Sequence, residues 1–349
     1  MTPVSNPGPS LLAPVPQREL NSFLSLVEGF AITRCCQLIA EFGIADVLGD
    51  TPERVAEIAA KAGVDASALG RVLRYAATIG VFEATGDGRF THTTRSRLLR
   101  GDHPQSLKGR IRNYGPGWIV FGALDHSLRT GRPAAEALAP GGLWEWLGAN
   151  PHLAKVFDEA MTSQNRGDLP ALLQAYDFSG FRSFADIGGG QGHLLRGLLE
   201  HVPAATGTLF DRPAVVDVVR AHPVERMSIV GGDFFTDALP EAEAYLLSQV
   251  LHNWDDENAV SILRNVRSAT AGRSTLFVFE EPLPATAMNA CAGSRASRPI
   301  FMDFSMLAWS SGRERTCDEY EKLLNEAGWR LERVVPAACY VSILAAVPI

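Results

Sequence analysis

Apolar residues recur three and four positions apart through the first part of the chain, which is the spacing of one helix face. In residues 18–49 this pattern predicts two long amphipathic helices with a break near Gly43. Residues 51–63 begin with Thr-Pro-Glu, a typical helix start with proline in the first turn, and residues 65–80 repeat the helical spacing. Two strand-like segments joined by a Gly-Asp-Gly turn at 86–88 then predict a β-hairpin.

A helix, a turn, a second helix and a hairpin form the winged-helix arrangement, which often binds DNA. Here the second helix offers only Arg71 and Arg74 as basic residues on a largely apolar surface. The chain also has a net charge of −7, whereas duplex binding needs cations that displace condensed counterions. We therefore expect the winged helix to contact protein, and no nucleic acid as a partner.

The pattern of the chain changes near Phe181. Residues 104–180 are expected to be helical, whereas apolar strand-like segments alternate with helices afterwards. The expected strands are residues 183–187, 207–210, 227–230, 244–247, 275–279, 331–335 and 340–346. This alternation predicts an α/β fold with a doubly wound, largely parallel sheet. We expect a disordered leader at 1–17, a helical and winged-helix domain at 18–178, and the α/β domain at 179–349.

Composition indicates the setting of the protein. At 349 residues, with 46% hydrophobic and 20% charged, the chain is long enough for two ordinary globular domains. Its five cysteines are odd in number and form no CxxC pair, which favours reduced thiols over disulfides or a zinc site. No apolar run approaches the roughly 20 residues that span a bilayer. We therefore expect a cytoplasmic protein with no bound metal and no membrane partner.

A glycine-rich turn follows the first expected strand of the sheet, where such sheets bind ligands. The segment 186–192, DIGGGQG, lets the backbone approach a ligand closely but lacks the third glycine of the dinucleotide motif. Asp211 ends the second strand and can bind both ribose hydroxyls, while Asp233 and Phe234 end the third and suit an adenine ring. Each aspartate alone could be a helix cap or a turn residue. The three features together predict a nucleoside site.

His252 follows the fourth expected strand, at the same edge of the sheet. An imidazole titrates at about pH 6.5, so its neutral form can take the proton of a phenol, whose pKa is about 10. Glu280 at the end of the fifth strand and Glu314 in the segment 312–316, GRERT, are candidates to orient the ring. The alternatives are a histidine in a core hydrogen bond and glutamates in surface ion pairs.

Together these segments resemble the caffeate and hydroxyneurosporene type O-methyltransferases, a family with bacterial members that act on aromatic polyketides and antibiotics. The resemblance runs from about residue 20 to the end of the chain. Its motifs are DIGGG at 186–190, LFDRP at 209–213, GGDFF at 231–235, VLHNW at 250–254 and GRERT at 312–316. It implies S-adenosylmethionine as cofactor, a homodimer formed by the N-terminal domain, and methylation of a phenolic hydroxyl of a small aromatic molecule.

By this resemblance His252 is the general base, and Glu280 and Glu314 flank it. The positions expected to bind the cofactor are Asp186, Gly188, Gly190, Asp211, Asp233, Phe234 and Ser248. The positions expected to line the substrate pocket are Trp118, Phe157, Met161, Asn165, Asn253, Met302, Asp303 and Met306. The three methionines would give an adaptable apolar surface for a flat ring.

Two positions depart from the family pattern. Relatives commonly have aspartate where this chain has Asn253, and often lysine where it has Ser248. Either change can alter substrate or cofactor contacts, but neither removes the base. The small, polar stretch 285–298 is expected to be a mobile loop over the pocket or a surface excursion.

Three other functions remain open. The same fold can methylate nitrogen, because an amine needs no strong base. It can also keep the cofactor and instead hydroxylate, decarboxylate or cyclise, although such members tend to lose the base that His252 would supply. A ligand-sensing regulator that uses the winged helix is a more distant interpretation, which the acidic charge disfavours.

Overall fold

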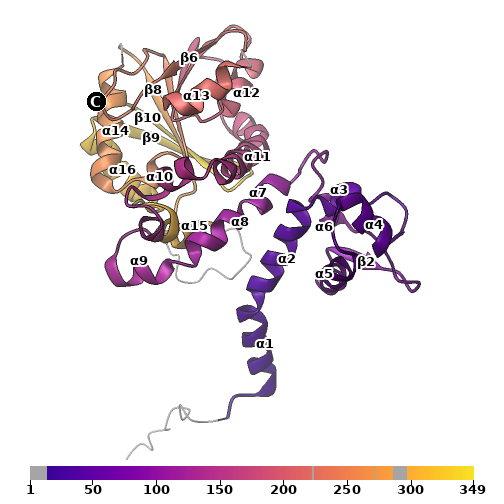
Figure 1. Cartoon of the computed structure of the whole chain (residues 1–349). Coiled ribbons are helices and arrows are strands. Elements are labelled where there is room, and N and C mark those ends of the chain that lie inside the picture. Colours follow the sequence, from indigo (N-terminus) through magenta and orange to yellow (C-terminus); the bar gives the residue numbers. More distant parts are fainter. Residues whose placement is uncertain (1–13, 222–223, 271, 286–296) are drawn as a thin grey trace, which may run out of the picture. The chain divides into compact units, whose positions relative to one another are not determined.

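The computed structural model describes residues 14–221, 224–270, 272–285 and 297–349 (Figure 1). The chain divides into two compact units, Met1–Tyr114 and Gly115–Ile349. This division differs from the boundary predicted at 178/179, because the helices that follow residue 115 share cores with the second unit. Most of the predicted leader at 1–17 lies outside the described residues.

Three helices open the first unit: α1 (Gln17–Val27), α2 (Gly29–Glu41) and α3 (Ile44–Val47). The predicted break near Gly43 is confirmed, because this glycine has a φ of +61°, a conformation that disfavours residues with a Cβ. A further break at Glu28, which the apolar spacing did not indicate, separates α1 from α2.

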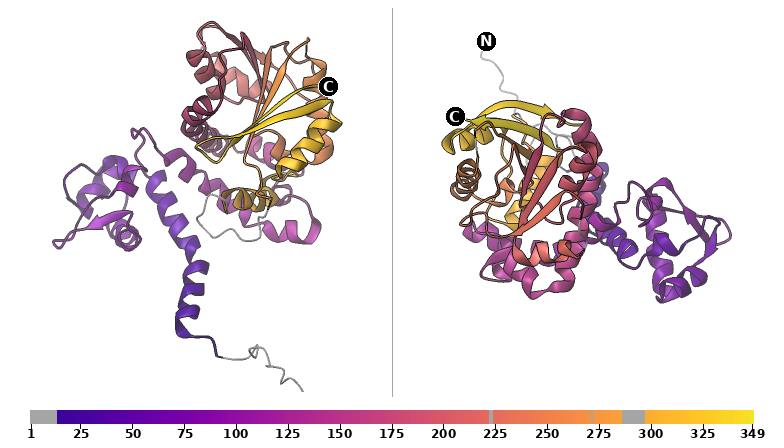
Figure 2. Two further views of the ribbon diagram at one scale, coloured as in Figure 1. Left: turned by 180° about the vertical axis from the view of Figure 1, so that it is seen from behind. Right: turned by 90° about the horizontal axis from the view of Figure 1, so that it is seen from above.

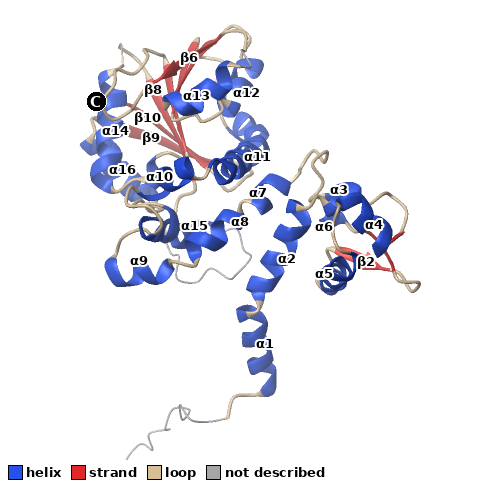
Figure 3. Cartoon of the chain, in the orientation of Figure 1, coloured by secondary structure: helices blue, strands red, loops and turns tan. Residues whose placement is uncertain are grey.

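The predicted order of helix, helix and hairpin is confirmed (Figure 3). The elements are α4 (Val55–Ala62), α5 (Ala66–Thr78), β2 (Phe82–Ala84) and β3 (Arg89–His92), followed by α6 (Thr94–Arg97) and α7 (Lys108–Arg112). The predicted helix start at Thr51 is wrong. Glu53–Arg54 forms β1 instead, because these two residues pair antiparallel with β3. Asp65 caps α5 by accepting a hydrogen bond from the Ala68 amide at 2.7 Å.

The first two helices carry an exposed apolar surface, which we call the N-terminal apolar surface. Its side chains are between 43% and 72% exposed and are Leu20, Phe23, Leu24, Leu26, Val27 and Phe30. By length and composition Gln17–Glu41 is apolar enough to cross a membrane, so the expectation that no segment approaches this length is wrong. Length and composition alone are weak evidence for a membrane span. An exposed apolar surface also marks a protein interface.

The second unit begins with helices, as predicted for 104–180. They are α8 (Tyr114–Phe121), α9 (Leu124–Thr130), the 3₁₀-helix η1 (Ala134–Ala137), α10 (Gly142–Ala149) and α11 (Pro151–Ala175). The elements α8, η1 and α10 form a small core with α15 (Ser297–Trp309), in which Val120, Trp146 and Ala308 are buried. The last turns of α11 reach the sheet instead, where Leu172 is buried.

Seven strands form the sheet of the second unit, in the order β6-β5-β4-β7-β8-β10-β9. Their bounds are β4 (Ser183–Ile187), β5 (Thr206–Asp211), β6 (Met227–Gly231), β7 (Ala244–Ser248), β8 (Thr275–Glu280), β9 (Trp329–Pro336) and β10 (Ser342–Pro348). The predicted strands are confirmed. The sheet is largely parallel as expected, and β10 alone among these strands runs antiparallel to both of its neighbours.

Helices cover both faces of this sheet (Figures 1 and 2). On one face pack α14 (Asp256–Ser268) and α16 (Cys317–Glu326), where Leu263 and Tyr320 are buried. On the other face pack α12 (His193–His201), α13 (Pro213–Arg220) and the end of α11, where Leu198 and Val216 are buried. The doubly wound α/β fold is therefore confirmed.

The strand order reverses between β4 and β7, which is the switch point where sheets of this kind bind ligands. The glycine-rich turn follows β4, and the 3₁₀-helix η2 (Leu251–Asn253) follows β7. Because β4 and β7 are parallel neighbours, the glycine-rich turn and His252 leave the sheet at the same edge.

Phe277 in β8 connects the sheet to the segment that follows α11. Its side chain is fully buried, and its ring lies 4.9 Å from Tyr176, 5.2 Å from Phe178 and 5.4 Å from Phe181. Phe277→Ala should lower the free energy of unfolding of the second unit by about 3–5 kcal/mol, because it removes a large buried ring. Denaturation followed by circular dichroism measures this loss. Val218→Ala, at a position that is 58% exposed on α13, is the control and should change it by less than about 0.5 kcal/mol.

Candidate active site

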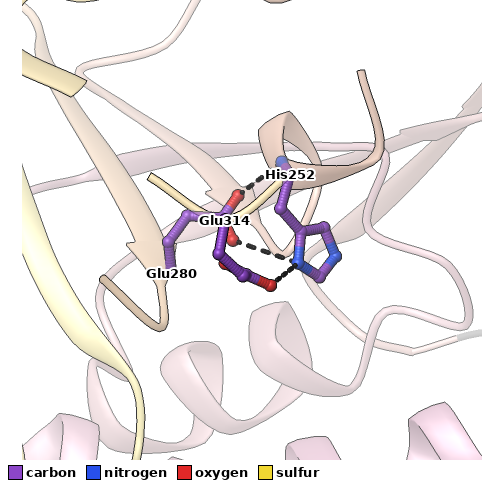
Figure 4. Close-up of side chains that lie close together, drawn as sticks. All are labelled: His252, Glu280 and Glu314. Atoms are coloured by element: carbon purple, nitrogen blue, oxygen red, sulfur yellow. Dashed lines mark hydrogen bonds and ion pairs between the residues drawn. The ribbon is translucent and has the colours of Figure 1, made fainter. Parts of the chain in front are cut away.

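His252 lies in a tight turn between β7 and α14. Gln249 directly after the strand has a φ of +53°, an uncommon conformation for a residue with a Cβ. The Asn253 side chain donates a hydrogen bond from Nδ2 to the Gln249 carbonyl at 2.9 Å, which closes the turn. His252 is buried, and its ring faces Glu280 at the end of β8 and Glu314 in the 312–316 segment (Figure 4).

Glu280 and Glu314 both approach the same nitrogen of the His252 ring. Nδ1 lies 2.8 Å from Glu314 Oε1, a hydrogen bond, and 3.6 Å from Glu280 Oε2. The His252 backbone amide also donates to Glu280 Oε1 at 3.3 Å. Across the described part of the chain, no group hydrogen-bonds the other ring nitrogen, Nε2, which points away from both glutamates (Figure 4). The geometry therefore fixes one ring nitrogen and leaves the other for a ligand.

Burial and charge act on this cluster in opposite directions. Burial alone lowers the pKa of His252, but the negative charges of Glu280 and Glu314 outweigh it and raise that pKa to about 9. Burial raises the pKa of Glu280 to about 7; the imidazolium opposes this effect and the Glu314 charge adds to it. The two carboxylates therefore favour the protonated form of the His252 ring.

The three side chains also have the composition of a metal site. One ligand atom from each of His252, Glu280 and Glu314 lies within 4.8 Å of the others. The 2.8 Å separation between Nδ1 and Glu314 is that of a direct hydrogen bond, so a metal ion would have to displace the shared proton. The arrangement favours a hydrogen-bonded histidine over a metal ligand.

The segment 312–316 brings Glu314 to the histidine by packing directly on its turn. A Cβ on Gly312 would collide with the His252 carbonyl and with the backbone that follows it, so only glycine allows this approach. The Glu314 amide donates to Asp303 Oδ1 at 3.1 Å, which ties the segment to α15. Thr316 then caps α16 by accepting a hydrogen bond from the Glu319 amide at 3.3 Å.

The glycine-rich turn and Asp211 form the second part of the site. Gly188 and Gly190 have φ values of +70° and +58°. The Gly190 amide donates to Asp211 Oδ2 at 2.8 Å, and the Arg212 amide donates to Oδ1 at 2.7 Å. Asp211 is therefore held beside the turn at the end of β5, the position of a ribose-binding carboxylate. Burial raises the pKa of this carboxyl, and these two amides oppose the rise.

Asp186 lies beneath the glycine-rich turn and has no exposed surface. A Cβ on Gly189 would collide with the Asp186 carboxylate, so the turn passes very closely over this side chain. Burial raises the pKa of Asp186 to about 7, and the charge of Asp211 adds to this effect. Asp186 therefore shapes the turn from its buried side.

Phe234 reaches the glycine-rich turn from the end of β6. A Cβ on Gly188 would lie 3.5 Å from the Phe234 ring, which packs edge-on against Trp254 at 6.0 Å. Asp233 is exposed and accepts a hydrogen bond from the Phe235 amide at 2.9 Å through one carboxylate oxygen, as a turn residue does. A close backbone turn, a carboxylate and a flat ring fit the nucleoside part of S-adenosylmethionine.

Ser248 and the expected substrate positions lie on β7, on the His252 turn and on three helices. Ser248 ends β7 and lines a small cavity with Leu172 and Leu194. Met302, Asp303 and Met306 lie on α15, which contacts η2, and Phe157 and Met161 lie on α11. Trp118 lies on α8, and Phe157 packs edge-on against Trp144 at 5.9 Å. The side chain of Asn165 lies outside the described residues, and the amide nitrogen of Asn253 is already bound within its own turn.

Arg315 lies within the GRERT motif, but residue type and spacing alone predict no function for it. Its side chain is fully buried and donates to the carbonyls of Leu251 and Trp254, on either side of His252. Arg313, two residues earlier, has a side chain that is 42% exposed. Residue type and spacing alone do not distinguish the two arginines, because burial depends on the fold of the segment.

Comparison with known families supports this description. Residues 121–330 match the O-methyltransferase domain family, and residues 24–102 match the O-methyltransferase dimerisation domain family. The dimerisation match covers the last residues of α1, α2 and the hairpin, so the first unit has the sequence of a dimer-forming region.

Individual relatives span nearly the whole chain. The phenazine O-methyltransferase PhzM of Lysobacter antibioticus is 36% identical over 335 residues, covering 93% of this chain and 95% of its own. The 8-amino-8-demethylriboflavin N,N-dimethyltransferase of Streptomyces davaonensis is 33% identical, covering 86% and 87%. The O-methyltransferase NcsB1 from neocarzinostatin biosynthesis, solved with S-adenosylmethionine and 2-hydroxy-5-methyl naphthoic acid, is 31% identical with a TM-score of 0.77, covering 91% and 96%. The chain therefore belongs to the S-adenosylmethionine-dependent O-methyltransferases, in which a dimerisation domain precedes the catalytic domain.

Proposed function

We propose that this enzyme methylates a phenolic hydroxyl of an aromatic secondary metabolite, with His252 as general base. The observation that carries the proposal is the buried hydrogen bond between His252 Nδ1 and Glu314. A carboxylate on one ring nitrogen fixes the tautomer and directs the other nitrogen, here Nε2, toward the reacting group. A relative named as a phenazine O-methyltransferase and one solved with a naphthoic acid support an aromatic acceptor.

S-adenosylmethionine supplies an electrophilic methyl group on a positively charged sulfur. Asp211 would bind the ribose hydroxyls, and Phe234 would stack on the adenine ring. His252 Nε2 would accept the hydroxyl proton as the acceptor oxygen becomes a nucleophile, a contribution of about 10²–10⁴-fold. Glu314 would stabilise the imidazolium that forms, and Glu280 would hold the backbone of the same residue.

The acceptor pocket is proposed to lie between α11, α15 and the His252 turn. Phe157 and Met161 would contact the flat ring from α11, and Met302 and Met306 from α15, with Trp118 on α8. Asn165, Asn253 and Asp303 would supply its polar contacts. The Asp303 carboxylate already accepts the Glu314 amide at 3.1 Å, so a substrate contact there would also bear on the catalytic glutamate.

Nitrogen methylation is the second candidate, because the riboflavin-derivative relative is named as an N,N-dimethyltransferase. An amine acceptor is already a nucleophile when neutral and needs less help from His252. Turnover of two acceptors that are identical except for a hydroxyl or an amino group separates the two functions.

The intact cluster of His252, Glu280 and Glu314 argues against a hydroxylase, decarboxylase or cyclase. Release of S-adenosylhomocysteine in each turnover tests whether the enzyme transfers a methyl group.

The N-terminal apolar surface is proposed to be part of a homodimer interface. It overlaps the segment that matches the dimerisation domain family, and its side chains are exposed in a single chain. Burying such a surface against a second copy removes apolar area from water. The wider range 18–178 stays our proposal for the dimerisation domain.

We also propose a cytoplasmic enzyme that binds neither nucleic acid nor membrane, in keeping with its net charge and its free cysteines at 35, 36, 317 and 339.

His252→Gln should lower the kcat for a phenolic acceptor at least about a hundredfold, because it removes the proton acceptor. Binding of S-adenosylmethionine, measured by isothermal titration calorimetry, should stay near normal because the glycine-rich turn, Asp211 and Phe234 follow β4, β5 and β6. Turnover equal to that of the wild type would remove the proposed mechanism. Loss of cofactor binding would show that the substitution disturbs more than the base.

The protonation of His252 should control the pH dependence. Its pKa of about 9 in the cofactor-free enzyme means that kcat/KM rises with pH up to about 9, since only the neutral ring is a base. Glu314→Gln removes a charge that raises this pKa and weakens the hydrogen bond to Nδ1, so the rising limb should move to lower pH. Imidazole NMR titration and the kcat/KM profile measure both changes. Glu321→Gln, an exposed position on α16, is the charge-matched control, and an unmoved midpoint in Glu314→Gln would contradict the assignment.

Leu26→Glu should convert the dimer to a monomer of 37.7 kDa, because it places a charge in the N-terminal apolar surface. Leu26 is 72% exposed in the single chain. Size-exclusion chromatography with light scattering measures the mass. Ser25→Glu adds the same charge at the neighbouring position on α1 and should leave the dimer intact. A wild-type protein of monomer mass would exclude this interface.

A further inference from the structure

Arg315 makes an unusual set of contacts for an arginine. Its side chain has no exposed surface. Nη1 donates to the Leu251 carbonyl at 3.1 Å, Nη2 to the Trp254 carbonyl at 2.7 Å, and Nε to Asp256 Oδ1 at 2.9 Å. Nη1 also donates to the Arg313 carbonyl at 3.4 Å. A buried guanidinium is costly unless its donors are satisfied, and here four different acceptors satisfy them.

Acceptors of the Arg315 side chain lie in the His252 turn and at the start of the next helix. The carbonyls of Leu251 and Trp254 are on either side of His252 and Asn253, so one guanidinium spans the turn that carries the base. Asp256 begins α14, the next element, and ties the same guanidinium to the helix. Arg315 therefore links the two ends of this turn to each other.

Arg315 also follows directly after Glu314, the hydrogen-bond partner of the His252 ring. The backbone that joins the two residues belongs to the segment whose Gly312 packs against the His252 carbonyl. One short segment thus contacts the ring of His252 through a carboxylate and the backbone on either side of His252 through a guanidinium. A shift of this segment would change both contacts together.

We propose that Arg315 is a positioning residue for the methyl transfer, which sets the place and orientation of His252 by holding the backbone of its turn. The inference rests on the proposed function of His252 as the base. Arginine suits this task better than lysine, because its planar group presents several donors in a fixed geometry, whereas an ammonium is a point charge on a flexible stem.

Arg313 provides a matched comparison within the same segment. Its guanidinium lies 3.3 Å from Asp256 Oδ2 and 2.8 Å from Glu319 Oε1, and its side chain is 42% exposed. Among the described residues, the partners of its side chain are these carboxylates and not the carbonyls of the turn. Replacing Arg313 removes a charge beside Asp256 without releasing the turn.

The test compares Arg315→Met, Arg315→Lys and Arg313→Met in the full-length enzyme. Arg315→Met should lower kcat by about a hundredfold, the effect of misplacing a reacting group by about 1 Å. Arg315→Lys should recover part of this loss, and Arg313→Met should stay within about twofold of the wild type. The dissociation constant for S-adenosylmethionine should change by less than about twofold in all three, because the glycine-rich turn, Asp211 and Phe234 follow β4, β5 and β6.

Two further readouts separate positioning from a general loss of structure. In Arg315→Met the midpoint of the NMR titration of the His252 ring should move to lower pH, because the hydrogen bond with Glu314 becomes weaker. Amide hydrogen exchange should rise at residues 251–254 and stay unchanged in β4. If Arg315→Met does not fold by circular dichroism, Asp256→Asn replaces it, because this partly exposed carboxylate anchors the same guanidinium. Asp256→Asn should then show a smaller loss of kcat together with faster exchange at 251–254.

The outcomes distinguish this inference from the proposed function. Two results together would overturn the positioning role. They are a wild-type kcat and an unchanged midpoint of the His252 titration in Arg315→Met, or in Asp256→Asn where that variant is used. An equal loss of kcat in Arg313→Met would also overturn it, because the effect would then follow charge and not the turn. Full turnover in His252→Gln would instead overturn the base, while the NMR and exchange readouts would still report whether Arg315 holds the turn.

Discussion

The hydrogen bond between His252 and Glu314 is the constraint on which the site depends. Both groups are buried, and a buried charge is tolerated only when it is paired and hydrogen-bonded. The bond joins residues that are 62 positions apart in the chain, so their two backbones must each be fixed. The close packing of Gly312, the amide contact to Asp303 and the closed turn at Asn253 all serve this requirement.

The sheet supplies the other requirement, which is that the base and the cofactor site meet at one edge. Parallel strands on both sides of the switch point end in the glycine-rich turn, in Asp211 and in the His252 turn. The cofactor side consists mainly of backbone and short side chains, whereas the catalytic side consists of buried charges. These two kinds of surface suit a nucleoside and a proton transfer respectively.

Local patterns in the sequence predicted most of the fold. The strands, the hairpin and the break at Gly43 follow from alternation, turn residues and glycine conformation, which neighbouring residues decide. Long-range packing decides what the local pattern missed: β1 forms at Glu53 because β3 pairs with it. In the site, the motif order predicted that His252 would meet both glutamates. The fold of the 312–316 segment decides that both glutamates approach Nδ1. It also decides that Arg315 rather than Arg313 is buried.

The adjacency of Glu314 and Arg315 limits how this loop can change during evolution. Two neighbouring residues contact opposite parts of one turn, the ring and the backbone, so their spacing along the chain matters as much as their identity. Inserting or deleting a single residue between Gly312 and Thr316 would move one of these contacts by more than 3 Å, the length of one residue. The length of this segment should therefore be the same in enzymes that keep this cluster, even where the acceptor and the surrounding pocket differ.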